Sequence, residues 1–336
     1  MKTRKTPGTA IGWTSACKPL KNNWRIRPPV RSVTVTRPAW PTACWCRKSS
    51  TPNASMWNSV VSSAPWRCSR PAWPCPPSNK PSPVPAPTLS PDNLPHLPQW
   101  PGVRVFCSTR LGGVSKPPFD SLNLGQHVGD AAVDVAENRQ RLAKAWGVKP
   151  VFLNQVHGTA LVRLDEHSPD MPEADACWTQ QPGVACTIMV ADCLPVLFYQ
   201  AQARVVAAAH AGWRGLAAGV LENTLHALSD FGAPGTWRVW LGPCIGPQAF
   251  EVGKDVRAAF EHQALAAGAF KPLAQPGKYL ADLPALARQR LHQTGVVHLE
   301  GNDSSPDWCT FSQAQLYFSH RRDGRSGRFA AGIALA

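Results

Sequence analysis

Three residues, His157, Cys193 and His210, have side chains that together could bind a metal ion. Each stands at the end of a run of residues typical of a strand, so all three are expected at one rim of the fold. Two imidazoles and one thiolate leave the fourth position of tetrahedral zinc open, and such an open site lowers the pKa of bound water to about 7. The separations of 36 and 17 residues match no zinc finger, so spacing alone leaves open that each is an ordinary buried residue.

Four other polar residues are candidates for catalysis. Arg110 lies in a Gly-rich loop, where its guanidinium could clamp a phosphate or be a solvated surface charge. Asn123 could fix a ribose hydroxyl or cap its own turn. Asp192 and, with a weaker signal, Asp175 could transfer a proton or orient a metal-binding histidine. The backbone amides of residues 212–215 begin a predicted helix and would form an anion site.

The elements that must position these residues are predicted to be a mixture of strands and helices. Runs rich in Val, Ile, Leu and aromatic residues predict strands within residues 103–110, 151–157, 161–164, 186–199, 204–210 and 237–246. Apolar residues at helical spacing predict helices over 130–147, 216–232 and 282–295, and residues 316–335 are predicted to form a closing hairpin. Without a regular βαβ repeat, we expect an α+β fold of mixed β-sheets packed with helices.

The first predicted helix has clear end signals. Asp130 is the expected N-cap and Gly147 the expected stop. Its buried face is expected to contain Val133, Ala136, Leu142 and Trp146.

Residues 1–91 differ sharply in composition from the rest of the chain. They hold 14 of the 35 Lys and Arg and none of the 21 Asp and Glu, so the formal net charge of +14 arises there and residues 92–336 are neutral. They have no Phe or Tyr but 17 of the 34 Pro, and without periodic aliphatic residues no core can offset the ordering entropy. We expect a disordered segment and hypothesise an N-terminal extension that arises from a start codon assigned too far upstream. The catalytic domain is then 92–336.

The same composition bears on where the protein works. No apolar run of signal-peptide length follows the basic start, and the best membrane candidate, residues 183–199, is interrupted by Asp192. The six cysteines of residues 92–336 are scattered singly, so a disulfide framework is not required. We therefore expect a cytoplasmic protein with reduced thiols and no membrane partner.

In several motifs the sequence resembles the YfiH family. NQVHG surrounds His157, ADCLPVLF surrounds Cys193 and HAGWRG surrounds His210, and TRLGGVS, SLNLG, LGPCIGPQAFEVG and YFSHRRDGRSGR complete a series in the family's order across nearly all of residues 92–336. The family is described as laccase-like polyphenol oxidoreductases and, for several members, as zinc enzymes that phosphorolyse purine nucleosides and deaminate adenosine. The resemblance implies a YfiH-like sandwich with His157, Cys193 and His210 as zinc ligands. His320 and Phe250 depart from the usual pattern without touching this set.

The resemblance implies a zinc-dependent purine nucleoside phosphorylase that acts on adenosine, inosine and methylthioadenosine and also deaminates adenosine. Phosphate held by Arg110 and the helix amides would attack the ribose C1′ as the purine leaves, and water activated by the metal would displace the 6-amino group. Purine nucleosides and phosphate are the expected partners, nucleic acid is not, and the oligomeric state stays open.

Three alternatives remain. Copper-dependent phenol oxidation would replace zinc by copper, but a multicopper centre needs many histidines, and the chain has ten His and no His-x-His pair. A cysteine hydrolase would use Cys193 as nucleophile and a histidine as base, and metal content distinguishes it from a zinc enzyme. A nucleic-acid-binding arm in residues 1–91 would need recurring basic and aromatic spacing, which the segment lacks.

Overall fold

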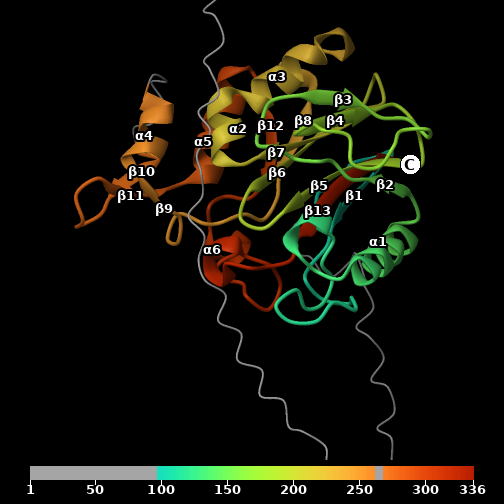
Figure 1. Ribbon diagram of the computed structural model, residues 1–336. Helices are drawn as coiled ribbons and strands as arrows, with labels where there is room; N and C mark the ends of the chain where they lie inside the picture. Colours follow the sequence, from blue (N-terminus) through green and yellow to red (C-terminus); the bar gives the residue numbers. More distant parts are fainter. Residues whose placement is uncertain (1–96, 262–267) are drawn as a thin grey trace, which may run out of the picture. The chain divides into compact units, whose positions relative to one another are not determined.

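The computed structural model describes residues 97–261 and 268–336, shown in Figure 1. The expectation for residues 1–91 therefore lies outside the described residues. Within the described part, no helix is both long and apolar enough to cross a bilayer.

Two larger sheets form the centre of the described fold. The six-stranded sheet has the order β12-β8-β6-β7-β4-β3 and is antiparallel except for the pairs β12–β8 and β3–β4. Its strands are β3 (Leu161–Arg163), β4 (Ala176–Thr179), β6 (Leu194–Gln200), β7 (Val205–Ala211), β8 (Arg238–Leu241) and β12 (His298–Gly301). The four-stranded sheet has the order β1-β13-β5-β2, in which only β2 and β5 run parallel. Its strands are β1 (Val103–Cys107), β2 (Lys149–Val151), β5 (Val184–Val190) and β13 (Phe329–Leu335).

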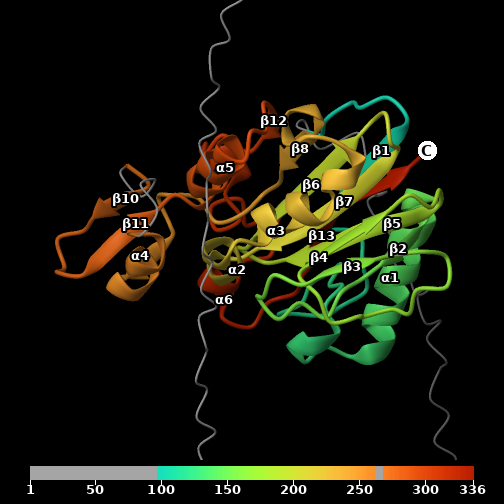
Figure 2. The same ribbon diagram turned by 90° about the horizontal axis from the view of Figure 1, so that it is seen from above.

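A third, smaller sheet has the order β10-β11-β9 and is antiparallel. Its strands are β9 (Glu251–Gly253), β10 (Phe270–Pro272) and β11 (Lys278–Ala281). With α4 (Lys254–Glu261) it lies to one side of the larger sheets, in orange in Figures 1 and 2.

The remaining helices cover the outer faces of the two larger sheets or connect their strands. They are α1 (Ala132–Trp146), α2 (Trp213–Ala218), α3 (Val220–Ala227), α5 (Leu283–Gln293), α6 (His320–Asp323) and the short 3-10 turns η2 (Gln126–Val128), η3 (Ser229–Phe231), η4 (Pro234–Thr236) and η5 (Pro306–Trp308).

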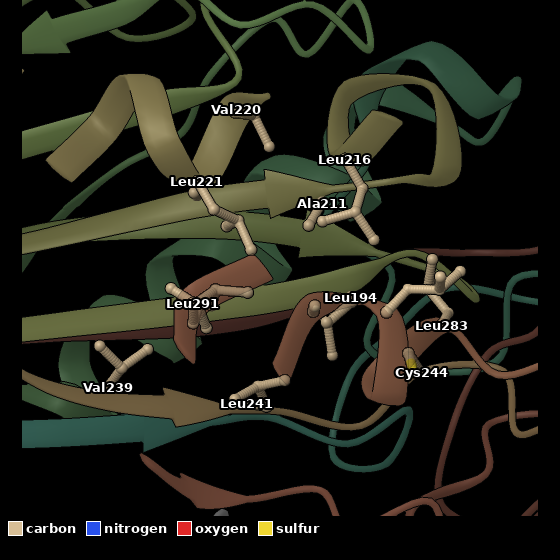
Figure 3. Close-up of a cluster of buried hydrophobic side chains, with 14 of the residues drawn as sticks. Leu194, Ala211, Leu216, Val220, Leu221, Val239, Leu241, Cys244, Leu283 and Leu291 are labelled. Carbon is tan, nitrogen blue, oxygen red and sulfur yellow. The ribbon is translucent and has the colours of Figure 1, made fainter. Parts of the chain in front are cut away.

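Strand alternation divides the core into three layers. On β5, Ile188 and Val190 pack into the cluster between the two sheets, whereas Met189 packs on the other face with Trp146 of α1. On β7, Ala208 faces the inter-sheet layer, and the opposite face of that sheet packs against α2, α3 and α5 in the cluster of Figure 3. The order of layers is therefore helix, sheet, sheet, helix, which confirms the predicted α+β fold with mixed sheets.

Several predicted elements differ from the observed ones because longer-range contacts override local pattern. Residues 186–199 form two strands in different sheets, β5 and β6, separated by the turn at Asp192. Residues 216–232 do not form one helix, because Gly219 has a φ of 96° and separates α2 from α3. Residues 316–335 form α6 and β13 rather than a hairpin, since β13 pairs with β1 and β5 instead.

The predicted buried face of α1 is partly wrong. Val133 is 76% exposed, whereas Asn138 and Arg139 are buried together with the predicted Leu142. Both polar side chains hydrogen bond to the loop before the helix, Asn138 to the carbonyl of Asn123 and Arg139 to that of Leu124, which explains their burial. The N-cap is Ala131 and not Asp130, whose carboxylate accepts hydrogen bonds from Ser115 and Asn123.

Candidate metal centre

Cys193 and His210 lie side by side at the end of the inter-sheet layer. Cys193 immediately precedes β6, and His210 on the neighbouring strand β7 pairs with Pro195. By alternation, Ala209 and Ala211 face the helices, so His210 between them faces the other sheet, where Cys193 also packs. The pairing of two strands therefore brings together ligands separated by 17 residues in sequence.

His157 reaches the same point from a loop rather than from a strand end. The strand β2 ends at Val151, so the predicted strand over 151–157 is wrong, and His157 has a φ of 62°. Gln155 explains how the loop is held, because its side chain bonds to both the backbone N and O of Met189 at 2.9 and 2.8 Å. The side-chain amide of Gln155 thus pairs with β5 beyond the end of β2. This pairing places His157 at the end of the sheet.

The three ligand atoms lie within 4.8 Å of one another. Nε2 of His157 and Sγ of Cys193 are 3.8 Å apart, and the two imidazole rings meet edge to face with centroids 4.8 Å apart. Tetrahedral zinc with ordinary bond lengths would place its nitrogen and sulfur ligands about 3.5 Å apart. The donor set therefore fits a four-coordinate metal with one position left for another ligand, and His157 is the exposed member of the three.

Asp175 is fully buried and organises two of the three ligands. It precedes β4, beside His210 on β7, and its Oδ1 lies 2.8 Å from Nδ1 of His210. The same carboxylate accepts hydrogen bonds from the backbone amides of Val156, His157 and Gly158. It thereby fixes the His210 ring with Nε2 toward Cys193, where a metal would bind, and its hydrogen bonds stabilise the positive φ of His157.

Asp192 supports the third ligand, Cys193, in a similar way. Its φ of 89° is rarely adopted by a residue with a side chain, and its carboxylate is committed to Thr310 Oγ1 at 2.6 Å and to the backbone N of Arg321 at 2.7 Å. Its backbone carbonyl accepts from the amide of Ile245. The structure thus shows Asp192 holding the turn before Cys193, without a contact to either histidine.

Two members of the donor set, Cys193 and His210, have strongly shifted pKa values. Burial raises the pKa of Cys193, but the charge of His210 and hydrogen bonds from His157 and His210 lower it to about 6. Burial lowers the pKa of His210, but Cys193 and Asp175 raise it to about 9. Burial also opposes ionisation of Asp175, yet the bonds from His210 and the amides hold its pKa below the usual value. Near neutral pH the Cys193 thiolate therefore pairs with a protonated His210, which must release its proton when a metal binds.

Two glycines of HAGWRG are needed for space. A Cβ on Gly212 would lie 2.8 Å from Cδ2 of His157 and 3.0 Å from Sγ of Cys193, and a Cβ on Gly215 would lie 2.9 Å from the carbonyl of Gly158. The helix α2 that begins here has only six residues. Gly212 therefore forms a close wall of the metal centre, and the anion site predicted at residues 212–215 stays a prediction.

Arg110 and Asn123 are both engaged in protein contacts. Arg110 donates Nε to the carbonyl of Asp120 and Nη1 to that of Ala314, and its Nη2 lies 3.4 Å from the Asp120 carboxylate. The buried Asn123 donates Nδ2 to Asp130 and to the carbonyl of Gly125, and its Oδ1 accepts from the amide of Gly125. Both side chains hold the loop that contains TRLGGVS and SLNLG.

Sequence reasoning underestimated the residues that support the ligands. The sequence signal for Asp175 was weaker than that for Asp192. Neither Gln155 nor Thr310 was assigned a role from the sequence. Gln155 belongs to NQVHG, so its place two residues before the ligand His157 was an available signal. Thr310 had none, because its contact with Asp192 spans 118 residues of sequence.

Comparison with known proteins identifies close relatives of residues 104–336. That range matches the family model described as multi-copper polyphenol oxidoreductase laccase. A Pseudomonas aeruginosa protein named purine nucleoside phosphorylase is 52% identical over 239 residues, which cover 70% of this chain and 95% of the relative. The purine nucleoside phosphorylase YfiH of Escherichia coli is 50% identical over 245 residues, which cover 71% of this chain and 98% of the relative.

Solved structures agree with the sequence comparison. The crystal structure of a Neisseria meningitidis protein is 44% identical and has a TM-score of 0.67, covering 71% of this chain and 96% of that one. The crystal structure of a Bacillus licheniformis hypothetical protein YfiH is 29% identical, also with a TM-score of 0.67, and covers 72% of this chain and 96% of that one.

Proposed function

This chain belongs to the YfiH family, described as multi-copper polyphenol oxidoreductase laccase, and on that premise we propose that it is a zinc-dependent purine nucleoside phosphorylase that also deaminates adenosine. The observation that carries the proposal is the convergence of His157, Cys193 and His210 within 4.8 Å. Adenosine, inosine and methylthioadenosine are the proposed nucleosides. We place the enzyme in the cytoplasm, with small molecules as its partners.

Zinc is favoured because the donors are one thiolate and two imidazoles, which together suit zinc. Bound in this set, zinc would supply Lewis-acid chemistry next to the substrate. His157 and Cys193 would hold it at the exposed side, and His210 from the buried side with its ring fixed by Asp175. A nucleoside would then approach the metal from the side of the exposed His157.

The two reactions make different demands on the chain. In phosphorolysis a phosphate oxygen forms a bond to the ribose C1′, the C1′–N9 bond breaks, and its electron pair leaves with the purine, which takes up a proton. In deamination, water adds at C6 of adenosine and ammonia leaves. Only phosphorolysis requires phosphate, an anionic nucleophile, to bind in the site. Loss of a phosphate-binding residue would therefore impair phosphorolysis more than deamination.

Asp175, Asp192, Arg110 and Asn123 contribute to this activity as positioning residues in our proposal. The two aspartates hold the ligands, as the hydrogen bonds of Asp175 to His210 and of Asp192, next to Cys193, to Thr310 indicate. Arg110 and Asn123 hold the neighbouring loop through carbonyl and carboxylate contacts.

Two rival functions have an observation in their favour. Copper-dependent phenol oxidation is the family's printed description, but the described residues contain a single three-donor group with histidine and cysteine. A cysteine hydrolase is favoured by the 3.8 Å approach of Cys193 to His157 and by the pKa of Cys193 of about 6. Metal content and substrate distinguish all three.

The decisive experiment is metal analysis of the purified full chain together with nucleoside assays. We expect about one zinc per chain, phosphate-dependent release of purine from inosine, and phosphate-independent formation of inosine from adenosine. Chelation should abolish both activities, and zinc should restore them. Untouched nucleosides at every phosphate concentration, with phenol oxidation by a copper-loaded sample, would establish the copper enzyme instead.

A further inference from the structure

Arg328 is placed beside the metal centre by strand register. The antiparallel pairing of β13 with β5 sets Phe329 opposite Val190. The residue before Phe329 therefore lies next to the residues that follow Val190, which are Ala191, Asp192 and Cys193. This argument depends only on backbone pairing and puts Arg328 at the same sheet end as Cys193.

The backbone of Arg328 is held against the SLNLG loop, and the start of its side chain packs beside that loop. Its backbone N donates to Oδ1 of Asn123 at 2.9 Å, and its carbonyl accepts from the amide of Leu124 at 3.0 Å. A Cβ on Gly125 would lie 2.8 Å from Cγ of Arg328, so this glycine provides the space through which the side chain passes. A side chain fixed in this way loses little conformational entropy when its head group binds a ligand.

The guanidinium of Arg328 is only partly used by the protein. Its Nη1 donates to the carbonyls of Ser326 and Gly327 at 2.9 and 3.0 Å, which are neutral acceptors of its own turn. Among the described residues, Nε and Nη2 have no hydrogen-bond partner, and no carboxylate lies within ion-pair distance of Arg328. A partly buried cation without a counter-ion is costly unless an anion joins it.

The electrostatics agree with this placement. Burial lowers the pKa of Arg328, and the opposing influences come from Cys193 and Asp192. Burial also lowers the pKa of His127, and Arg328, Arg139, His157 and His210 lower it further. Arg328 and His127 are therefore within electrostatic range of the metal ligands. The nearby Asp192 carboxylate is already occupied by Thr310 and the amide of Arg321.

We propose that Arg328 binds the phosphate that takes part in phosphorolysis, with Nε and Nη2 donating to two phosphate oxygens at the edge of the metal centre. The planar fork of a guanidinium suits two oxygens of one phosphate, and Nη1 stays on its turn to fix the plane. The proposal rests on the proposed function for the identity of the anion. It deepens that function by assigning a role to Arg328, which is not among the predicted site residues Arg110, Asn123, Asp175 and Asp192. Arg110 is not the phosphate ligand in this arrangement, because it is used by Asp120 and Ala314.

Binding of inorganic phosphate to the zinc-loaded full chain, without nucleoside, tests the proposal independently of catalysis. We expect Arg328→Met to raise the dissociation constant for phosphate by about tenfold or more, and Arg328→Lys by less, because lysine keeps the charge but not the fork. Arg325→Met is the matched control in the same segment and should bind phosphate like the unaltered chain. In phosphorolysis, Arg328→Met should raise the KM for phosphate much more than the KM for inosine.

Zinc content and the thermal midpoint of each variant separate binding from folding. If Arg328→Met fails to fold, the smaller change in Arg328→Lys decides, since the lysine can still donate to Ser326. Unchanged phosphate affinity in Arg328→Lys and Arg328→Met, or no phosphate binding by the unaltered chain, overturns the inference. Arg328-dependent phosphate binding without conversion of nucleosides supports the phosphate site and contradicts the proposed function, so the two failures are distinct.

Discussion

At the scale of single residues, the three-donor group depends on the carboxylate of Asp175, which is not a member of that group. Asp175 accepts from His210 and from three successive backbone amides, so one buried side chain fixes the orientation of one ligand and the backbone of another. Its burial costs free energy that these four hydrogen bonds offset. Loss of its charge should therefore affect the metal and the fold together.

Asp175→Asn is expected to weaken zinc binding by about 10- to 100-fold, because the amide cannot accept all four hydrogen bonds or balance the charge of His210. It should also lower the free energy of unfolding of the metal-free chain by about 2 kcal/mol, since a buried amide keeps unpaired donors. Chelator competition and urea unfolding measure the two effects. Asp230→Asn, at an exposed position of η3, is the control, and an equal effect of both variants would contradict the role of Asp175.

Cys193→Ser should lower zinc occupancy and both activities in parallel. The thiolate is the softest and the only anionic ligand of the set, and a hydroxyl cannot replace its charge near neutral pH. Zinc measured by mass spectrometry and nucleoside turnover are the readouts, with Cys107→Ser, a buried thiol outside the three-donor group, as control. Full zinc content without activity would favour the cysteine hydrolase instead.

At the scale of elements, the candidate metal centre forms where the start of β6 and the end of β7 meet the start of α2. Gly212, at the start of α2, has no side chain that would separate them. The pairing of β6 with β7 brings Cys193 beside His210, and the start of α2 closes over both. Gly212 has a φ of −65° and a ψ of 157°, which any residue can adopt, so space rather than backbone conformation selects glycine here.

Gly212→Ala is therefore expected to displace His157 and Cys193 and to reduce zinc affinity by roughly tenfold, with a loss of stability of about 1–3 kcal/mol from overpacking. The fold should persist, as judged by circular dichroism. Gly235→Ala is the matched control, because its Cβ would meet nothing closer than 3.4 Å. Normal zinc affinity in Gly212→Ala would show that the ligands can move aside without penalty.

At the scale of the whole molecule, two sheets pack face to face and each carries helices on its outer face. The inter-sheet layer ends at the metal centre. Val190, which packs in that layer, lies three residues before Cys193, and Ala209, which packs against the helices, directly precedes His210. The family match begins at residue 104, and the charge excess lies before residue 92. The family match and the net charge thus belong to different parts of the chain.

Removal of residues 1–91 is expected to leave the thermal midpoint, zinc content and turnover unchanged, because this composition cannot form a core and the segment precedes the family match. Trp100 must be kept, since its ring packs in the inter-sheet cluster and its Nε1 donates to Glu300. Scanning calorimetry and nucleoside assays of the 92–336 chain provide the comparison. Aggregation or inactivity of that chain would assign a structural role to the segment.

The sequence was sufficient for the ligand types and the class of fold. His157, Cys193 and His210 could be named from their motifs, and the mixture of strand and helix periods predicted α+β, because residue chemistry and local periodicity are properties of short segments. It was also sufficient to separate a neutral domain from a basic segment, since charge is counted without coordinates.

Only the tertiary structure decided which residues meet. Asp175 faces His210 because β4 pairs with β7, and Arg328 lies at the same sheet end as Cys193 because β13 pairs with β5 rather than folding back as a hairpin. Such pairings join segments far apart in the chain, and a shift of one residue in register would turn every side chain to the opposite face. Local patterns do not contain that choice, because it depends on how all the strands pack at once.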